Sequence, residues 1–254
     1  MELLVRDSQA LLTLSRPPVN ALSQGVLQDL KGALKECAGN PEVRVIVLAS
    51  ALPKAFSAGA DIQELVWLDE AKSVEFGALG HSVCDYIESL PKPVIAAVRG
   101  IAFGGGCEVA MACDLRIAGA SASFALPEIN LGIIPGWGGT QRLPRLVGKT
   151  AALEMVMTGT PVPASHALSL GLVNCVVPDE EVLDEALRLG ATLAAKPPIA
   201  LVLAKRAIHE GAREGLEDGL AVERDLFGQV RSTQDAQEGI EAFLEKRKPR
   251  YQGR

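Results

Sequence analysis

The chain of 254 residues is poor in aromatic side chains, in histidine and in long apolar segments. Aromatic residues make up 4% of it, so the core must consist mainly of Ala, Val, Leu and Ile. The three histidines, His81, His166 and His209, stand apart, without a GxSxG motif or metal-ligand spacing, which argues against a Ser-His-Asp triad and against a metal site. No apolar run reaches the ~18 residues that a transmembrane helix needs, so no membrane partner is expected.

Cysteine pairs and positive charge are also scarce. Five cysteines, an odd number without a CxxC pair, predict free thiols of the kind found in a reducing compartment. The formal net charge of −6 argues against a nucleic-acid partner, because phosphates require a basic surface. The first residues lack the pattern of a secretory signal, so we expect a cytoplasmic protein. The basic segment EKRKPRYQGR fits either a solvated tail or a contact with a phosphate-bearing ligand.

The order of apolar segments predicts an α/β protein. Strands are expected at 3–5, 10–14, 43–50, 91–100, 114–120 and 172–178. Helices are expected at 24–38, 61–90, 104–113, 179–195, 198–213, 216–230 and 233–247. Strands that alternate with helices favour parallel pairing through crossovers. We therefore expect an α/β core at 1–190 and a helical C-terminal portion at 191–254.

Two loops of small residues are candidates for binding an anion. Gly104 begins a glycine triplet between a predicted strand and a predicted helix, and the first N–H groups of a helix have no internal partner. The triplet matches neither GxGxxG nor a phosphate-binding loop. The loop FSAGADI offers a second open N–H at Ala60. Two such donors could converge on one oxygen as an oxyanion hole, although each loop alone is also typical of a turn or a close packing contact.

Two glutamates stand among apolar residues. Glu108 lies one turn into the glycine-started helix, and Glu128 lies in FALPEINLG. Carboxyl groups in apolar settings can have separated pKa values and can divide the roles of acid and base. The alternatives are a solvent-facing helix residue for Glu108 and a helix N-cap or turn residue for Glu128.

Taken together, these segments resemble a known family. FSAGADI, IAFGGGCEVAMACDLRIA, FALPEINLGIIPGWGGTQRLPRLVG and AALEMVMTGTPVPASHALSLGLVNCVV, in this order, closely resemble the enoyl-CoA hydratase/isomerase (crotonase) family over nearly the whole chain. The resemblance implies the crotonase fold, an α/β superhelix of stacked ββα turns with a helical C-terminal trimerisation portion. It also implies a homotrimer or hexamer that binds acyl-CoA. No metal or separate cofactor is implied, because coenzyme A is part of the substrate.

The same resemblance implies roles for individual residues. The N–H groups of Ala60 and Gly105 would form the oxyanion hole, Glu108 would hold and activate water, and Glu128 would donate a proton to C2. The residues implied in CoA or substrate binding are Arg16, Val19, Ala21, Ala58, Gly59, Asp61, Ile62, Gly104, Gly136, Phe243 and Lys246. The last two resemble an element that covers CoA, often from a neighbouring subunit. RPPVNAL is one residue shorter than the RPKALNAL of many hydratases, so the loop positions can shift by one.

The presence of both glutamates favours an enoyl-CoA hydratase, which adds water reversibly and with syn geometry to a trans-2-enoyl-CoA to give a 3-hydroxyacyl-CoA. The alternatives are an enoyl-CoA isomerase, a methylglutaconyl-CoA hydratase and an RNA-binding protein. The segments LPRLVG and KPRYQG resemble the methylglutaconyl-CoA hydratase branch. RNA-binding members carry a lysine-rich first helix, whereas the predicted first helix of this chain, 24–38, has only Lys31 and Lys35. Leu65, Trp67, Leu68 and Trp137 could line an acyl pocket or pack in the core.

Overall fold

The computed structural model describes residues 1–254 and is built around a six-stranded sheet of order β1-β2-β3-β5-β7-β10. Its strands are β1 Glu2–Arg6, β2 Gln9–Leu14, β3 Val45–Ser50, β5 Val94–Val98, β7 Leu115–Gly119 and β10 Cys175–Val177. β1 and β2, both expected as strands, form an antiparallel hairpin, and every other pair in this sheet is parallel. The predicted α/β class with crossovers is therefore confirmed.

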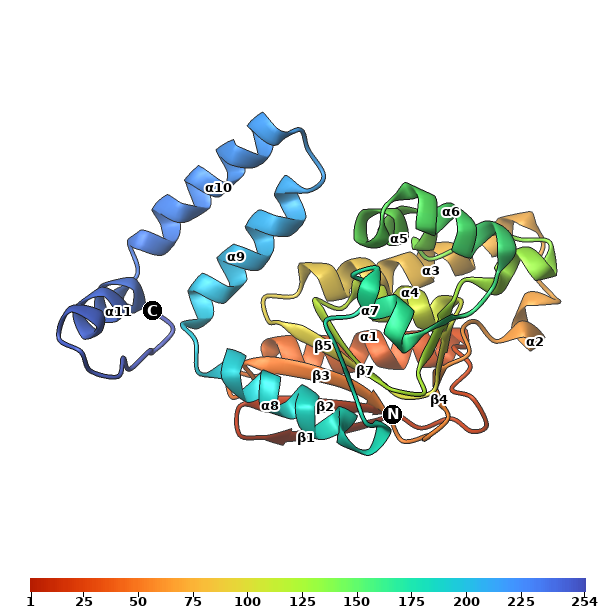
Figure 1. The fold of residues 1–254 in the computed structure, drawn as a ribbon, viewed down its shortest axis with the longest axis horizontal. Helices are drawn as coiled ribbons and strands as arrows, with labels where there is room; N and C mark the ends of the chain where they lie inside the picture. The colour runs from red at the N-terminus through yellow and green to blue at the C-terminus, as the bar shows by residue number, and fades with distance from the viewer.

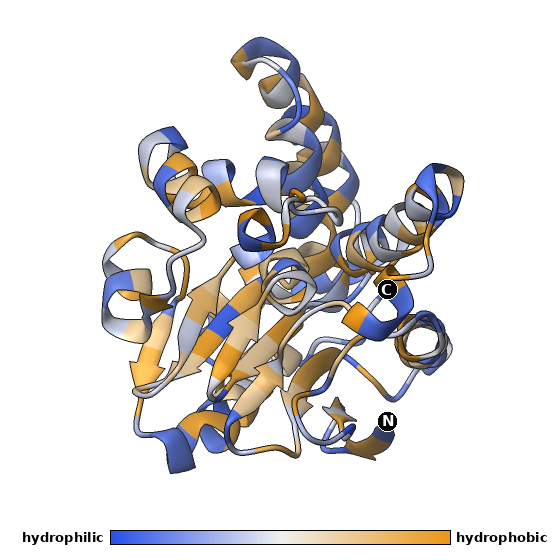
Figure 2. Ribbon diagram, turned by 90° about the vertical axis from the view of Figure 1, so that its right-hand side faces the viewer, coloured by the Kyte–Doolittle hydropathy of each residue, from blue (hydrophilic) through white to orange (hydrophobic).

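Both faces of this sheet are covered by helices. On one face, Ile46 and Leu48 of β3 pack in a core shared with α1 (Gln24–Gly39) and α3 (Glu70–Ser89). On the other face, Val45 and Val47 pack with α8 (Val182–Ala194). The central strands are consequently apolar at successive positions, as the run VIVLAS is, because neither face meets water. Figure 2 shows this concentration of hydrophobic residues on the strands.

The helix α1 illustrates how local sequence sets the elements. Ser23 caps it by accepting a hydrogen bond from the Val26 N–H at 3.3 Å. Leu27, Leu30 and Leu34 follow at helical spacing and are buried against the sheet. The helix expected at 61–90 is in fact two helices, α2 (Ile62–Leu65) and α3, because Asp69 caps a new start by accepting from Lys72 N–H.

A second, smaller sheet was not predicted from the sequence. It has the order β4-β6-β8-β9, with β4 Ala55–Ser57, β6 Ile101–Phe103, β8 Ser123–Ala125 and β9 Val162–Pro163. These strands have two or three residues each, too few to show a periodic pattern, and β4 was expected to be loop. β4, β6 and β8 are parallel, so their carboxyl ends meet at one edge of the sheet. The chain beyond these ends carries the candidate site.

A buried arginine closes the end of α4 (Gly105–Ala112), the helix that begins in the glycine triplet. Arg116 is 5% exposed, and its guanidinium donates to the carbonyls of Ala110, Met111 and Cys113 at the helix end, and to that of Leu172. A cation at this position satisfies carbonyls that have no partner within the helix and complements the helix dipole. Burial lowers the pKa of Arg116 from its ordinary value.

The remaining helices lie beyond the sheets. α4 is followed by the 3-10 turn η1 (Pro127–Leu131), then by α5 (Gly139–Val147), α6 (Lys149–Thr158), α7 (Ala164–Ser169) and the turn η2 (Asp179–Glu181). The expected boundary at residue 190 falls inside α8, which stays packed on the sheet to its end because Ala186 and Ala194 are part of that core. The chain then leaves the core as α9 (Pro198–Gly211), α10 (Leu216–Arg231) and α11 (Gln234–Leu244).

These last three helices form an arm. Figure 1 shows α9 and α10 as an antiparallel pair that extends away from the sheets, with α11 and the C-terminus at its far side. The arm is joined to the core through α9, where Lys205 Nζ donates to Asp114 Oδ2 at 2.9 Å and His209 lies 3.2 Å from Asp114 Oδ1. No single helix is both long and apolar enough to cross a membrane, although α8 and α9 together, bent by 108°, reach that length and composition.

We predict that Arg116→Met destabilises the protein by about 3 kcal/mol or more, because buried carbonyls at the end of α4 would lose their donors. The free energy of unfolding in urea measures this. Arg188→Met is the control, since Arg188 is exposed and pairs only with Glu185 on its own helix, and its unfolding midpoint should not move. Equal midpoints for the two variants would contradict the role given to Arg116.

Candidate active site

Three chain segments meet at the carboxyl edge of the small sheet. They are residues 58–61 after β4, the glycine triplet after β6 and the turn η1 after β8. A Cβ added to Gly59 would lie 2.9 Å from the Gly105 nitrogen, and one added to Gly104 would lie 3.0 Å from Glu128 Oε1. Gly59 has φ +97° and Gly104 has φ +50°, so both positions require glycine for conformation as well as for space.

The loop at 58–61 leaves one backbone donor free. The Ala58 N–H donates to the Val19 carbonyl at 2.9 Å, and the Asp61 N–H donates to the Leu22 carbonyl at 3.2 Å. The Gly59 N–H donates to Ser57 Oγ at 3.1 Å. The Ala60 N–H has no acceptor within the chain. The segment at 19–22 and Ser57 thus occupy the other N–H groups of this loop, and the Ala60 N–H remains as its free donor.

The second donor comes from the start of α4. Its first bond of helical type runs from the Glu108 N–H to the Gly104 carbonyl at 3.0 Å, so the helix does not use the Gly105 N–H. Gly105 must also lack a side chain, because a Cβ there would overlap the indole of Trp137. Ala60 and Gly105 line the same cavity, so two backbone N–H groups without an acceptor in the chain belong to one site.

Glu108 is a buried carboxyl group, 1% exposed. Its Oε1 accepts hydrogen bonds from the Trp137 N–H at 2.8 Å and from the Gly139 N–H at 2.7 Å. Burial raises the pKa of Glu108 to about 7, and these two N–H groups limit the rise because they favour the charged form. The interpretation of Glu108 as a solvent-facing residue is therefore excluded.

Glu128 projects from η1 and is half-buried. Its Oε2 is buried and has no hydrogen-bond partner within the chain. Burial is the main cause that raises the pKa of Glu128 above its ordinary value. An oxygen without a partner in an apolar setting favours the protonated acid, so the two carboxyl groups differ in environment and in their readiness to hold a proton.

Both carboxyl groups line one cavity of about 710 Å³. Its predicted lining residues are Ala58, Ala60, Ile62, Leu65, Leu68, Gly104, Gly105, Glu108, Glu128, Gly136 and Trp137. Phe76 of α3 and the apolar residues Leu131, Ile133 and Ile134 also line it and were not singled out from the sequence. The segment INLGIIPG carried a signal for the last three, because its apolar residues belong to no strand or helix expected from the sequence. Trp67 is 79% exposed and does not line the cavity.

The other predicted residues of the N-terminal half support the loop rather than line the cavity. Arg16 pairs with Asp61 at 2.7 Å and donates to the Ala21 carbonyl at 2.7 Å. This ion pair lowers the pKa of Asp61. Val19 and Gly59 hold the loop backbone, as described above. The carboxylate of Asp61 thus partly neutralises the Arg16 charge that was expected to meet a CoA phosphate.

Phe243 and Lys246 lie at the end of α11 and just after it, and neither lines the cavity of its own chain. The arm holds α11 away from the sheets (Figure 1). The basic tail is not free either. Glu238 accepts from Arg247 at 2.6 Å and 2.9 Å and from the Arg250 N–H at 2.7 Å, while Asp235 accepts from the N–H groups of Gln252 and Gly253.

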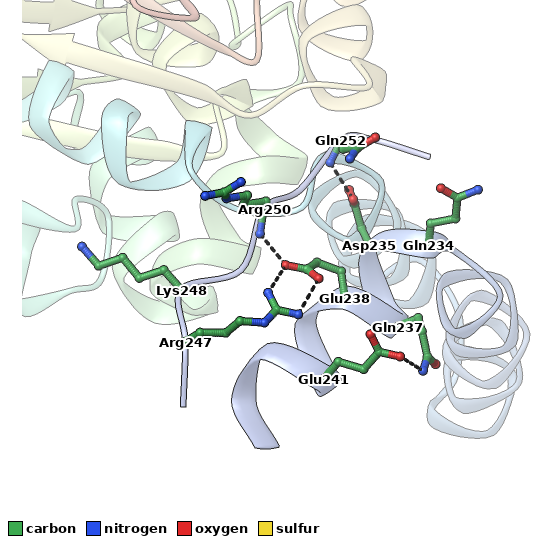
Figure 3. A pocket seen from close by; sticks show the side chains of 9 residues that line it. All are labelled: Gln234, Asp235, Gln237, Glu238, Glu241, Arg247, Lys248, Arg250 and Gln252. Carbon is green, nitrogen blue, oxygen red and sulfur yellow. Dashed lines mark hydrogen bonds and ion pairs between the residues drawn. The ribbon is translucent and has the colours of Figure 1, made fainter. Parts of the chain in front are cut away.

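Figure 3 shows this folded-back tail with the side chains of Lys248 and Arg250 directed away from Glu238. The cleft between the tail and α11 measures about 920 Å³ and has no apolar lining residue. An acyl chain gains free energy only from apolar surroundings, so this cleft does not suit one. The cavity with Glu108 and Glu128 does, because ten of its nineteen lining residues are hydrophobic.

Comparisons with known proteins agree with this geometry. The family model described as enoyl-CoA hydratase/isomerase matches residues 6–254. The chain belongs to the enoyl-CoA hydratase/isomerase family. A crotonyl-CoA hydratase of Syntrophomonas wolfei is 44% identical over 246 residues, which cover 96% of this chain and 95% of the relative. A short-chain-enoyl-CoA hydratase of Clostridium acetobutylicum is 42% identical over 240 residues, covering 94% and 92%.

Solved structures of the family share the fold of this chain. An enoyl-CoA hydratase from Bacillus anthracis superposes with a TM-score of 0.93 at 41% identity and covers 97% of this chain and 96% of its own. One from Geobacillus kaustophilus superposes with a TM-score of 0.95 at 41% identity, covering 100% and 98%. The crotonase fold predicted from the sequence is confirmed by this likeness.

The raised pKa of Glu108 predicts how stability depends on pH. Between pH 4.5 and about pH 7 the folded protein keeps the Glu108 proton and the unfolded chain has lost it, so the free energy of unfolding falls as pH rises. The loss is about 3 kcal/mol over this range. Glu108→Gln keeps an oxygen acceptor and has no proton to lose. Urea unfolding of both proteins should therefore show the wild type losing stability relative to the variant, and parallel curves would contradict this.

Proposed function

We propose that this chain is an enoyl-CoA hydratase, which adds water to a trans-2-enoyl-CoA and gives a 3-hydroxyacyl-CoA. One observation carries the proposal: two carboxyl groups of raised pKa, Glu108 and Glu128, face one largely apolar cavity that two unused backbone N–H groups also reach. The printed names of the relatives from Syntrophomonas and Clostridium support it.

The two N–H groups act on the thioester carbonyl. When the water oxygen attacks C3, electrons move onto the thioester oxygen, which becomes enolate-like. The Ala60 and Gly105 N–H groups donate to that oxygen, and a donor of this kind contributes about 3 kcal/mol of transition-state stabilisation. The thioester already acidifies C2, so the reaction requires no metal and no separate cofactor.

The carboxyl groups divide the proton transfers. Glu108 holds the water and takes one of its protons as the oxygen bonds to C3. Both hydrogen bonds to Glu108 lie on Oε1, which leaves Oε2 without a partner in the chain and able to bind the water. Glu128, whose buried Oε2 also has no partner, donates its proton to C2. In the reverse direction Glu128 is the base, and the roles exchange.

An enoyl-CoA isomerase is the second candidate, and the family name includes that activity. It would need one carboxyl group to move a proton between C2 and C4 and no group to hold water. Burial of Glu108 is costly, as its raised pKa shows, and an isomerase does not need a second carboxyl group to hold water. The presence of Glu108 in the cavity therefore favours the hydratase.

We propose short enoyl chains as substrates. Trp137 and Phe76 pack edge to face at the cavity wall, with 5.5 Å between ring centres, and limit the length of the cavity.

The arm supports an oligomer, which we propose to be a trimer or a dimer of trimers. Large apolar side chains are exposed along it, namely Ile208, Leu216, Leu220, Phe227, Ile240, Phe243 and Leu244. Such an apolar surface on one projecting element is typical of a subunit interface. Phe243 and Lys246, which do not reach the cavity of their own chain, would then cover CoA bound to a neighbouring subunit. We propose a cytoplasmic location for the assembly.

The hydratase proposal predicts the effect of removing either carboxyl group. Glu108→Gln and Glu128→Gln should each lower kcat for crotonyl-CoA hydration about 1000-fold, because a positioned acid or base contributes about 100-fold to 10,000-fold. Loss of the enoyl absorbance of crotonyl-CoA measures the rate. The kcat/KM of the wild type should rise with pH through about 7 as Glu108 ionises.

Glu64→Gln is the control for this experiment, because Glu64 caps α1 through the Gln24 N–H and does not line the cavity. It should keep the rate of the wild type. No hydration by the wild type, or full hydration by Glu128→Gln, would reject the proposal. Turnover of a 3-enoyl-CoA that exceeds hydration would favour the isomerase instead.

The oligomer proposal predicts that a charge on the arm dissociates the assembly. Phe227→Glu on α10 should lower the mass in solution from three or more chains to one, since the glutamate would have to be desolvated at the interface. Light scattering after size exclusion measures the mass. Met157→Glu is the matched control, because Met157 is exposed to a similar extent, 68% against 67%, and lies outside the arm. An unchanged mass for Phe227→Glu would contradict this interface.

A further inference from the structure

The loop that holds Glu108 is itself held from behind by an arginine. Arg142 of α5 donates from Nη1 to the Trp137 carbonyl at 2.8 Å. The N–H of the same Trp137 donates to Glu108 Oε1 at 2.8 Å. Arg142 thus binds the Trp137 carbonyl, and Glu108 binds the N–H of the same residue. Arg142 itself does not line the cavity.

The guanidinium of Arg142 is fixed by the long helix α3. Its Nε donates to Glu88 Oε1 at 2.7 Å, and its Nη2 donates to Asp85 Oδ1 at 2.8 Å. The side chains of Arg142 and Glu88 are 12% and 14% exposed, so water screens this pair little. Arg213 also reaches Glu88, at 3.3 Å, but it is 61% exposed and contributes little. Glu88 keeps a pKa below its ordinary value, against the effect of burial, because Arg142 is its partner.

The loop backbone is shaped around this guanidinium. Gly138 has φ +105°, and a Cβ there would overlap Arg142 Nη1. The next residue, Gly139, donates the second hydrogen bond to Glu108 and has no room for a Cβ, which would lie 2.9 Å from Glu108 Oε1. The segment PGWGGTQR therefore places two N–H groups against Glu108 on one side and a carbonyl against Arg142 on the other.

We propose that Arg142, held by Glu88, is a positioning residue that sets where the Glu108 carboxyl group stands in the cavity. The inference rests on the proposed hydratase activity, in which Glu108 must hold the attacking water in line with C3. Arg142 has no contact with substrate in this role. It acts through the Trp137 backbone: when Arg142 no longer holds the Trp137 carbonyl, the N–H of the same residue loses its fixed direction toward Glu108.

The charge of Arg142 has a second effect, which gives the experiment a specific readout. It lowers the pKa of Glu108 against the effect of burial, whereas the charge of Glu128, on η1, raises it. Cys84 of α3 also faces this group, but burial raises its pKa so that it stays neutral. Removal of Arg142 should therefore raise the pKa of Glu108, and a smaller fraction of the enzyme would be ionised at neutral pH.

The test is the hydration of crotonyl-CoA by Arg142→Met over a range of pH. We expect kcat to fall about 100-fold, as for other misplaced catalytic groups, with KM within about twofold of the wild type. The acid side of the pH profile should move to higher pH. Arg142→Lys should restore part of the rate, because one ammonium group can replace some of the three contacts.

Arg145→Met is the matched control on the same helix. Arg145 is exposed and donates only to the Gln141 carbonyl, so kcat and the pH profile should not change. If Arg142→Met does not fold, Glu88→Gln releases the guanidinium more gently and should lower kcat about tenfold. The acid side of its pH profile should not move to higher pH, because Arg142 keeps its charge.

The outcomes separate the two proposals. A wild type that does not hydrate crotonyl-CoA rejects the hydratase. A wild type that does, together with an Arg142→Met variant of unchanged kcat and pH profile or a Glu88→Gln variant of unchanged kcat, rejects the positioning role. A lower melting temperature with unchanged kcat of the folded protein also rejects it, because Arg142 would then contribute to stability alone.

Discussion

The structure of the site depends on one buried carboxyl group and on the two backbone N–H groups that meet it. A charge with no partner would not persist at the depth of Glu108, where 1% of the residue is exposed. Trp137 and Gly139 supply the partners, and Arg142 holds the same stretch of chain on its outer side through the Trp137 carbonyl. The indole of Trp137 then fills the space left by Gly80 and Gly105, neither of which could carry a Cβ. Gly105 thus makes room for the indole while its own N–H stays unused by the helix.

The burial of Glu108 lowers the stability of the fold at neutral pH. A pKa raised to about 7 means that the folded state resists the ionised form that a base requires at neutral pH. The chain limits that cost with fixed dipoles instead of a direct ion pair, which leaves Glu108 Oε2 free. A cation in direct contact would hold the carboxylate ionised and would also weaken it as a base. Arg142, one residue removed, lowers the pKa without occupying the carboxyl group.

Much of the larger sheet could be predicted, because its elements are long enough to show their pattern. The helix α1 has a serine cap and leucines at helical spacing, and β3 is a continuous apolar run. The small sheet could not be predicted, since β4, β6 and β8 have three residues each and are defined only by pairing with distant strands. Ala60, Glu108 and Glu128 were candidates from their local settings, and the motif resemblance gave them their implied roles and added Gly105. Arg142 could not be assigned a role from the sequence, because no local pattern links it to Glu88 and Trp137.

The candidate site and the arm are formed by different parts of the chain. The two backbone donors and the two carboxyl groups all follow strands of one small sheet, so the topology of a single chain assembles the candidate site. Phe243 and Lys246 stand on the arm instead, whose direction is set at the junction with α9 by Asp114, Lys205 and His209. The proposed chemistry can therefore be complete in one chain while the proposed cover for CoA requires another. Substitutions at the strand ends should then act on kcat, and substitutions on the arm should act first on KM and on the assembly, because each set touches a different part of the substrate.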